Sequence, residues 1–246
     1  MRRFAIAPER VVDGRVTFDA LETRHLARVL RLKPGDTVVA SDGAGHDFTV
    51  RLDAVRPRAA GTVLGVRAAA AESPLAITLV QGVPKGDKLD TIVRAATELG
   101  VARIVPALTA RSVVRLAGRA AEARRERWQR VAREAAKQCG RAVVPDVAAP
   151  RELAACLDAA RDADVALCLW EGDAPALALA LADVAPPRRI AILVGPEGGL
   201  ERAEVDAARA RGWRVAGLGS RVLRTETAGP ALLAILQSRW GDLGTT

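Results

Sequence analysis

The run VGPEGG at residues 194–199 combines residue types that could bind a ligand. It follows an apolar segment that predicts a buried strand, RIAILVG, and precedes a segment that predicts a helix, ERAEVDAAR. Ligands usually bind where the strands of an α/β sheet end, and glycines let backbone amides approach them closely. The run lacks the G-x-G-x-x-G and Walker patterns, which disfavours NAD and ATP as ligands. An ordinary glycine-rich turn is the alternative interpretation.

A second run, GLGSRVLRTETA at residues 217–228, also follows a predicted strand and opens a predicted helix. We expect Thr225 to cap that helix with its hydroxyl and Glu226 to lie in its first turn. A well-capped terminal helix explains this run when it is taken alone. Because the two runs follow consecutive strands, they could also line one crevice together. Lys85 and Lys88 follow a third strand end, where ion pairs at a helix N-terminus are the favoured interpretation.

Basic residues are concentrated between residues 111 and 141, where ten Lys or Arg stand against three Asp or Glu. A merely solvated helix face tends to mix charges of both signs so that neighbouring turns can pair. The excess therefore favours contact with the phosphates of a nucleic acid. The candidates are Arg111, Arg115, Arg130, Arg133, Lys137 and Arg141, and the last four share one face of a predicted helix. The apolar face of that helix is expected to contain Trp128, Val131, Ala132, Ala135 and Cys139.

The N-terminal part of the chain has a second basic group, which comprises Arg2, Arg3, Arg24, Arg28 and Arg31. The last three of these lie on one face of a short predicted helix. A small barrel with a basic face suits the binding of an oligonucleotide, and ordinary surface charge explains the same pattern equally well.

Two kinds of predicted structure position these residues. Residues 1–70 contain short strands rich in Val, Thr and Phe and one helical piece, a pattern that indicates a small β-barrel domain. A linker is predicted at residues 68–74. Residues 75–246 alternate apolar strands with helices, which indicates an α/β domain with a mostly parallel sheet. The predicted helices of this second domain span residues 87–100, 119–139, 151–161, 174–183, 201–212 and 226–240.

Composition limits the possible classes of protein. The 246 residues are 50% hydrophobic, enough for a large core, and carry a net charge of +8, which suggests a polyanionic partner. No apolar stretch reaches the roughly 18 residues that a membrane span needs, and the N-terminus lacks the apolar core of a signal peptide. The three cysteines and two histidines are too scattered for a disulfide framework or a zinc site. We therefore expect a cytoplasmic protein with no membrane span and no bound metal.

Several motifs together resemble the SPOUT methyltransferases, and more narrowly the family that methylates N3 of a uridine in small-subunit (16S) ribosomal RNA. The run GPEGG after a strand and the run LGSRVLRTETA before the last helix are similar to the S-adenosylmethionine (AdoMet) binding region of these enzymes. The resemblance continues in the expected order over nearly the whole chain. Its other pieces are HLARVLRLKPGD at 25–36, KGDKLDTIVRAATELGV at 85–101, RSVVR at 111–115 and RWQRVAREAAKQCGR at 127–141.

The resemblance implies an N-terminal PUA-like barrel that binds RNA and a C-terminal α/β domain with a deep trefoil knot. It also implies a homodimer with AdoMet held by the loops of the knot, and 16S ribosomal RNA or the small ribosomal subunit as the partner. The matching AdoMet-binding positions in this sequence are Leu193, Val194, Gly195, Pro196, Glu197, Gly198, Gly199, Gly217, Leu218, Gly219, Leu223, Arg224, Thr225, Glu226, Thr227 and Ala228.

The implied reaction makes particular demands on the protein. The N3 atom of uridine carries a proton, so the enzyme must favour the developing uracil anion and remove that proton. Arg224 is the best-placed cation for the anion, because it lies in a loop that would hold AdoMet. Glu197 and Glu226 are the nearest carboxylates, and the sequence does not choose between them as the proton acceptor. Because N3 lies on the pairing edge, the target uridine must be unpaired or flipped out.

Two other interpretations of function stay open at this point. A knotted methyltransferase that modifies another nucleotide of ribosomal RNA or tRNA would share the AdoMet loops and differ in the barrel. A non-catalytic assembly factor with the same fold would bind RNA without consuming AdoMet.

Overall fold

The computed structural model describes residues 2–69, 72–113 and 117–244. Its internal contacts divide the chain into two compact units. The first unit contains the residues up to Glu72 together with Ala136–Val144, and the second contains Ser73–Ala135 and Pro145–Thr246. The sequence alone does not place the segment 136–144 in the first unit. Residues 70 and 71 of the expected linker lie outside the described part of the chain.

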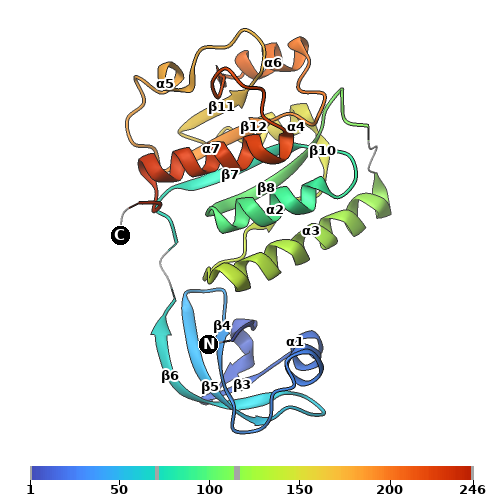
Figure 1. The fold of residues 1–246 in the computed structure, drawn as a ribbon, viewed down its shortest axis with the longest axis vertical. Helices are drawn as coiled ribbons and strands as arrows, with labels where there is room; N and C mark the ends of the chain where they lie inside the picture. Colours follow the sequence, from blue (N-terminus) through green and yellow to red (C-terminus); the bar gives the residue numbers. More distant parts are fainter. Residues whose placement is uncertain (1, 70–71, 114–116, 245–246) are drawn as a thin grey trace. The chain divides into compact units, whose positions relative to one another are not determined.

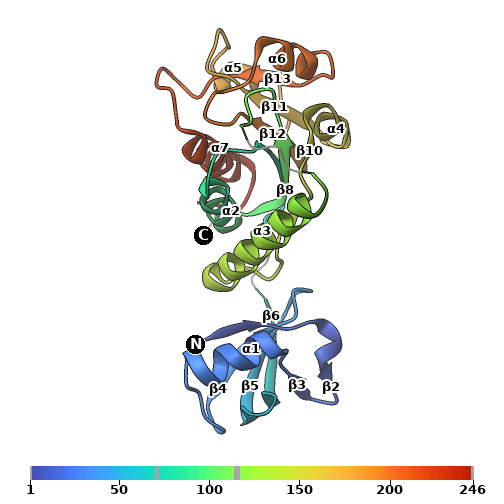
Figure 2. The ribbon, with the colours of Figure 1, turned by 90° about the vertical axis from the view of Figure 1, so that its right-hand side faces the viewer.

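The first unit is built on a six-stranded sheet in the order β1-β4-β5-β6-β3-β2 (Figure 2). Its strands are β1 (Arg3–Ala5), β2 (Val11–Val12), β3 (Arg15–Thr17), β4 (Thr37–Ser41), β5 (His46–Ala54) and β6 (Ala60–Ala68). Strand β1 pairs in parallel with β4, and all other neighbours are antiparallel. Phe4 and Phe18 meet edge to face in the core of this unit, with their ring centroids 5.9 Å apart.

The helical piece expected in the first unit is present but changes its winding. Helix α1 (Ala20–Arg24) begins after Asp19, whose carboxylate accepts a hydrogen bond from the backbone N–H of Glu22 at 2.7 Å. The chain then continues as a π-helix, η2 (His25–Val29). Wide turns of this kind are frequent at functional sites. The helical segment stops before Arg31, whose φ of 51° is incompatible with a right-handed helix.

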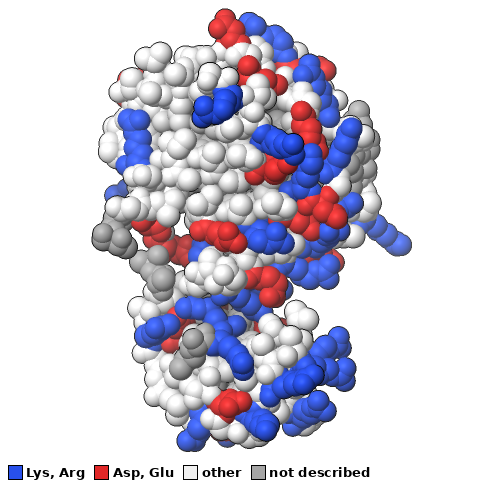
Figure 3. All heavy atoms as spheres, viewed as in Figure 1, with Lys and Arg blue, Asp and Glu red and all other residues white. Residues whose placement is uncertain are grey.

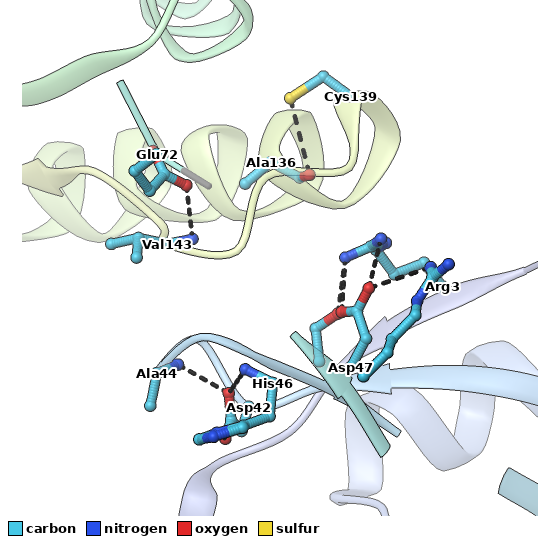
Figure 4. Close-up of polar contacts among 11 residues, drawn as sticks. Arg3, Asp42, Ala44, His46, Asp47, Glu72, Ala136, Cys139 and Val143 are labelled. Carbon is cyan, nitrogen blue, oxygen red and sulfur yellow. Dashed lines mark hydrogen bonds and ion pairs between the residues drawn. The ribbon is translucent and has the colours of Figure 1, made fainter. Parts of the chain in front are cut away.

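A buried carboxylate stabilises the sheet of the first unit. Asp47 on β5 accepts two hydrogen bonds from the guanidinium of Arg3, both at 2.8 Å (Figure 4). It also accepts hydrogen bonds from the hydroxyl of Ser41 at 2.6 Å and from Arg67 at 3.1 Å. A buried carboxylate needs several such donors to offset its desolvation. Arg3 is therefore held by the fold.

The second unit contains a sheet in the order β10-β8-β7-β12-β11-β13, and β9 also pairs with β8. Its strands are β7 (Ala76–Gly82), β8 (Val101–Leu108), β9 (Asp146–Val147), β10 (Arg151–Glu152), β11 (Val165–Leu169), β12 (Arg189–Val194) and β13 (Arg214–Ala216). All of these pairings are parallel. The predicted parallel α/β sheet is therefore confirmed.

Helices cover both faces of this sheet (Figures 1 and 2). They are α2 (Lys88–Glu98), α3 (Gly118–Cys139), α4 (Leu153–Asp158), α5 (Leu177–Ala180), α6 (Arg202–Arg209) and α7 (Thr225–Trp240). Helices α2 and α7 pack beside each other on one face, whereas α4 and α6 pack on the other. The apolar stripe of α2 is buried, and Gly100 provides the left-handed turn after it, with a φ of 79°.

Two ion pairs attach the segment 136–144 to the first unit. Lys137, near the end of α3, pairs with Glu22, and their side chains are only 9% and 3% exposed. The guanidinium of Arg141 lies 2.6 Å from the carboxylate of Glu72. Removing one partner of a buried ion pair leaves an uncompensated charge and is strongly destabilising. These two basic side chains therefore hold this segment in place.

Two expectations about local structure are wrong in detail. The helix expected over residues 174–183 is reduced to α5. Residues i and i+2 of a helix lie on nearly opposite sides, so the alternating leucines of the run ALALALA cannot form one apolar face. As a result Leu179 is 70% exposed, whereas Leu181 is buried. In α3, Cys139 is exposed and Ala136 takes the buried position instead.

Three strand ends meet at the carboxyl edge of the second unit. Strand β12 returns between β7 and β11, and β13 is added beside β11. Because all of these strands run in the same direction, the segments that follow β11, β12 and β13 leave the sheet at one edge. The trefoil knot implied by the resemblance stays a prediction.

Gly82, the last residue of β7, lies directly against the loop that follows β12. A Cβ atom at this position would lie 2.6 Å from the ring of Pro196 and 2.7 Å from its backbone nitrogen. We expect Gly82→Ala to lower the free energy of unfolding by about 1–3 kcal/mol, because the added methyl group overpacks this contact. The measurement is chemical denaturation followed by tryptophan fluorescence.

Gly65→Ala is the matched control, since a Cβ atom on Gly65 would meet no described atom within 4 Å. It should change the free energy of unfolding by less than about 0.5 kcal/mol. Equal losses in the two variants would show that the contact with Pro196 does not limit stability.

Candidate functional site

A cavity of about 460 Å³ lies at the carboxyl edge of the parallel sheet. Its walls come from the ends of three strands and the segments that follow them, together with Lys88 of α2. These are residues 169–172 and 174 at β11, 194–197 and 199 at β12, and 216–226 and 228 at β13. A space of this size suits a small organic ligand. The candidate AdoMet-binding positions line it, except Leu193, Gly198 and Thr227. The two runs singled out from the sequence therefore form one crevice, as their positions after consecutive strands predict.

The loop after β12 turns tightly at two glycines. Gly199 has a φ of 71°, and its backbone N–H donates to the carbonyl of Pro196 at 2.9 Å. A Cβ atom on Gly195 would lie 2.8 Å from the carbonyl carbon of Gly199, so a side chain there would force the turn open. Leu193 is fully buried in β12 and supports the loop from the sheet. Since glycines line this wall, a ligand would meet backbone atoms there.

A buried polar contact connects this loop to the start of α7. The hydroxyl of Thr225 donates to the carbonyl of Gly195 at 2.7 Å and accepts a hydrogen bond from the side-chain amide of Gln81 at 3.0 Å. The expectation that Thr225 caps α7 is wrong, because Arg224 occupies the cap position and the hydroxyl is used by the loop. Gln81 is fully buried and was missed from sequence, although a glutamine inside the apolar run ITLVQGV was a usable signal.

The carboxylate of Glu197 is held by neighbouring groups. One of its oxygens lies 2.9 Å from the ammonium of Lys88, and the backbone N–H of Lys85 donates to it at 3.1 Å. Burial acts to raise the pKa of Glu197, but Lys88 and the backbone N–H groups of Glu197 and Lys85 outweigh it and lower the pKa below its ordinary value. Glu197 therefore stays ionised and is a poor proton acceptor.

Glu226 offers a different kind of carboxylate. Its side chain is 23% exposed, and its buried Oε2 atom has no hydrogen-bond partner within the described residues. Arg224 is the nearest cation, with its Nη1 atom 3.9 Å from Oε1 of Glu226. The Arg224 side chain is 85% exposed at the edge of the cavity, so its guanidinium can reach a ligand. Glu226 thus combines a buried oxygen that lacks a partner within the described residues with a second oxygen on the side of the exposed Arg224 guanidinium.

The segment after β11 also lines the cavity, and sequence analysis missed it. The face of the Trp170 ring lies 5.4 Å from the guanidinium of Arg202 and 5.9 Å from that of Arg209, distances typical of cation–π contacts. Glu171 follows it and also lines the cavity. The rule that ligands bind at strand ends, applied to the run DVALCLWEG, would have included these residues.

Arg111 contacts the loop after β12 from the side of β8. Its Nη1 atom donates to the carbonyl of Gly198 at 2.6 Å, and its Nε atom lies 3.8 Å from the carboxylate of Glu201. The adjacent backbone N–H, that of Ala110, donates to Glu204 at 2.8 Å. Arg111 thus contacts the loop after β12, although the sequence places it among the RNA candidates.

The remaining basic candidates fall into two groups. Those that are exposed and have no acidic partner within the described residues are Arg2, Arg24, Arg28 and Arg31 in the first unit and Arg130 and Arg133 in the second. Those engaged in ion pairs are Arg3, Lys137 and Arg141. Arg115 lies outside the described residues. Figure 3 shows basic side chains gathered on the first unit beside α1.

Two further properties concern metals and membranes. Over residues 2–69, 72–113 and 117–244, no group of three or more His, Cys, Asp or Glu side chains is placed to hold a metal ion. None of the helices in this part of the chain is long and apolar enough to cross a membrane.

Comparison with known families gives two matches. The family described as RNA methyltransferase domain matches residues 71–237, which include the whole parallel sheet and its cavity. The family described as RNA methyltransferase PUA domain matches residues 19–59 of the first unit. The first unit is therefore PUA-like, as the resemblance predicts.

Similar proteins cover nearly the whole chain. Ribosomal RNA small subunit methyltransferase E of Synechocystis is 34% identical over 94% of this chain and 76% of its own length. A crystal structure of the enzyme of that name from Neisseria gonorrhoeae, bound to S-adenosyl methionine, matches with a TM-score of 0.87 and 35% identity over 98% of this chain and 99% of that one.

A putative methyltransferase from Legionella pneumophila, solved with bound SAM, has a TM-score of 0.90 and 28% identity, and the match covers 98% of both chains. Fold, motif order and sequence identity agree with one another. The chain belongs to the ribosomal RNA small subunit methyltransferase E family.

Proposed function

We propose that the protein transfers a methyl group from AdoMet to N3 of a uridine in 16S ribosomal RNA. The family supports an RNA methyltransferase, and two similar structures contain the methyl donor. The observation that carries the proposal is the cavity at the carboxyl edge of the sheet, where the free carboxylate oxygen of Glu226 lies near the exposed guanidinium of Arg224. Together they provide a proton acceptor and an anion-stabilising cation.

The cavity fits AdoMet in size and in the chemistry of its walls. Glycines at 195, 199, 217 and 219 let backbone groups approach a ligand, and Val194, Leu218 and Leu223 offer apolar surface. The buried Oε2 atom of Glu226 lacks a partner within the described residues, which is typical of a group that binds a ligand. AdoMet supplies, when bound, a methyl group on a positively charged sulfur.

The chain's own residues supply the remaining requirements of the reaction. In the proposed mechanism Glu226 accepts the N3 proton of uridine, and Arg224 favours the negative charge that develops on the uracil ring. Glu197 does not take part in proton transfer, because Lys88 and Lys85 hold it as an ion. Its role is to fix the loop after β12. The target uridine must be unpaired so that its N3 edge is accessible.

We also propose that the protein acts as a homodimer. Figure 3 shows that the face of the second unit covered by α7 has few charged side chains. Large apolar side chains exposed in this unit include Leu179, Val222 and Ile235. Apolar surface of this kind is typical of protein–protein interfaces.

The proposed reaction can be tested by incubating unmodified small ribosomal subunits with the protein and AdoMet and measuring the nucleosides by mass spectrometry. We expect 3-methyluridine to form. A different methylated nucleoside would support the alternative of a methyltransferase with another target. Binding of RNA and AdoMet without any methylation of subunits, free ribosomal RNA or tRNA would support a non-catalytic assembly factor.

Substitutions at the two proposed catalytic residues should lower turnover more than binding. We expect Glu226→Gln to reduce kcat by about 10²- to 10⁴-fold, because general bases contribute on this scale. Arg224→Ala should also abolish most turnover while RNA affinity falls only modestly. Steady-state kinetics measures turnover, filter binding measures RNA affinity, and calorimetric binding of S-adenosylhomocysteine measures the donor site.

Asp173→Asn is the control for loss of a negative charge, since Asp173 is exposed and does not line the cavity. It should leave turnover unchanged. Turnover of Glu226→Gln within a few-fold of the unmodified protein would rule out its role as the base.

Contact of α3 with RNA is proposed for Arg130 and Arg133, which are exposed. Each phosphate contact contributes roughly 0.7–0.9 to the slope of log affinity against log salt concentration. The double variant Arg130→Ala/Arg133→Ala should therefore lower the magnitude of this slope by about 1.5. Filter binding at several salt concentrations provides the measurement.

The matched control, Arg161→Ala/Arg189→Ala, removes two arginines that are also exposed but are paired with Asp158 and Asp164. It alters the net charge by the same amount and should leave the slope nearly unchanged. An equal change of slope in the two double variants would show a general effect of charge and no contact by α3.

A further inference from the structure

We infer that Arg111 is a positioning residue that holds the cofactor loop, residues 195–201, in its binding shape, and that it is not a phosphate contact. The inference rests on the proposed function, because it takes this loop as part of the AdoMet site. It changes the role expected for Arg111 from sequence, where the basic character of the segment 111–141 indicates RNA.

The contact between Arg111 and the loop is close and directional. The Nη1 atom of Arg111 donates to the carbonyl of Gly198 at 2.6 Å. The methylene groups of the same side chain pack against Gly198, since a Cβ atom there would lie 3.2 Å from both Cβ and Cδ of Arg111. Hydrogen bonds from a charged donor are stronger than neutral ones. Gly198 therefore leaves space for the arginine, which in turn fixes the carbonyl.

The backbone that carries Arg111 is itself held in place. The hydroxyls of Thr109 and Ser112 lie 3.0 Å apart, and the backbone N–H of Ser112 donates to the carbonyl of Thr109 at 3.0 Å. Both side chains are buried. The side chain thus extends from an ordered turn, so the contact with the loop costs the rotamer entropy of Arg111 and no further backbone entropy.

One carboxylate lies within ion-pair distance of this guanidinium, and a second binds the backbone beside Arg111. Its Nε atom lies 3.8 Å from Glu201, and Glu204 accepts a hydrogen bond from the backbone N–H of Ala110 at 2.8 Å. Glu201 and Glu204 also form the capping box of α6. The carboxylate of Glu201 therefore offsets part of the charge of Arg111 and disfavours the approach of an RNA phosphate.

The loop after β12 is held at two places, by Arg111 at Gly198 and by Lys88 at Glu197. Glu197 is bound to Lys88 at 2.9 Å, on the side of α2. Between these anchors the N–H of Gly199 donates to the carbonyl of Pro196. Gly195 and Gly199 line the cavity, so the position of their backbone decides what a ligand meets. Loss of Arg111 would release one side of this turn.

The test measures donor binding in the absence of RNA. We expect Arg111→Ala to weaken the binding of S-adenosylhomocysteine about tenfold in calorimetry, as expected for loss of a charged hydrogen bond. Arg111→Lys keeps a cation that can reach the carbonyl of Gly198 and should recover part of this loss. The salt dependence of RNA binding should not change in either variant. Arg161→Ala, on an exposed arginine distant in the chain, should leave donor binding unchanged.

Hydrogen exchange of the Gly199 amide gives a readout that needs no donor. This amide should exchange faster in Arg111→Ala than in the unmodified protein or in Arg161→Ala, while the thermal transition stays cooperative. Failure of the unmodified protein to bind AdoMet or S-adenosylhomocysteine would contradict the proposed function, and the exchange rate would still test the role of Arg111.

Two results would overturn the inference. One is an unchanged exchange rate of the Gly199 amide. The other is donor affinity within twofold of the unmodified protein combined with a salt slope for RNA binding that falls by about 0.7–0.9, the value for one lost phosphate contact.

Discussion

The hydroxyl of Thr225 connects the parts of the chain that build the cavity. It donates to the carbonyl of Gly195 in the loop after β12 and accepts from Gln81 on β7, while its own backbone begins α7. These groups are buried, so a lost hydrogen bond would leave polar atoms without water to replace it. This contact therefore fixes the loop after β12 against the start of α7, where the proposed catalytic residues Arg224 and Glu226 lie.

The carboxylates of the cavity differ in their surroundings, and the roles proposed for them rest on this difference. Glu197 is bound by an ammonium and a backbone N–H, which stabilise the ion and use its lone pairs. Glu226 keeps a buried oxygen without a partner in the described residues, beside a guanidinium that reaches the solvent. Position in the sequence could not distinguish the two residues, because both lie in glycine-containing runs at strand ends.

Sequence patterns predicted those features that depend on neighbours along the chain. Local periodicity predicts the apolar stripe of α2 and the alternation of strands with helices. The geometry of parallel strands predicts that the two glycine-containing runs form one crevice. Gln81 was missed because its partners, Gly195 and Thr225, are brought to it only by the pairing of β7 with β12. The prediction of a helix over residues 174–183 was wrong for a local reason. The segment is apolar in composition, but its alternating leucines do not form a single buried face.

The basic residues of α3 show most clearly that sequence patterns do not reveal partners that are distant along the chain. Helical spacing placed Arg130, Arg133, Lys137 and Arg141 on one face, but spacing does not reveal acidic partners far along the chain. Lys137 is neutralised by Glu22 and Arg141 by Glu72, whereas Arg130 and Arg133 have no acidic partner in the described residues. A buried pair contributes little field outside the protein, and an exposed unpaired arginine can replace the counterions of a phosphate. The excess charge of the segment 111–141 therefore overstates the surface that it could offer to RNA. The proposed contacts that remain are Arg130 and Arg133, which form no ion pair within the described residues.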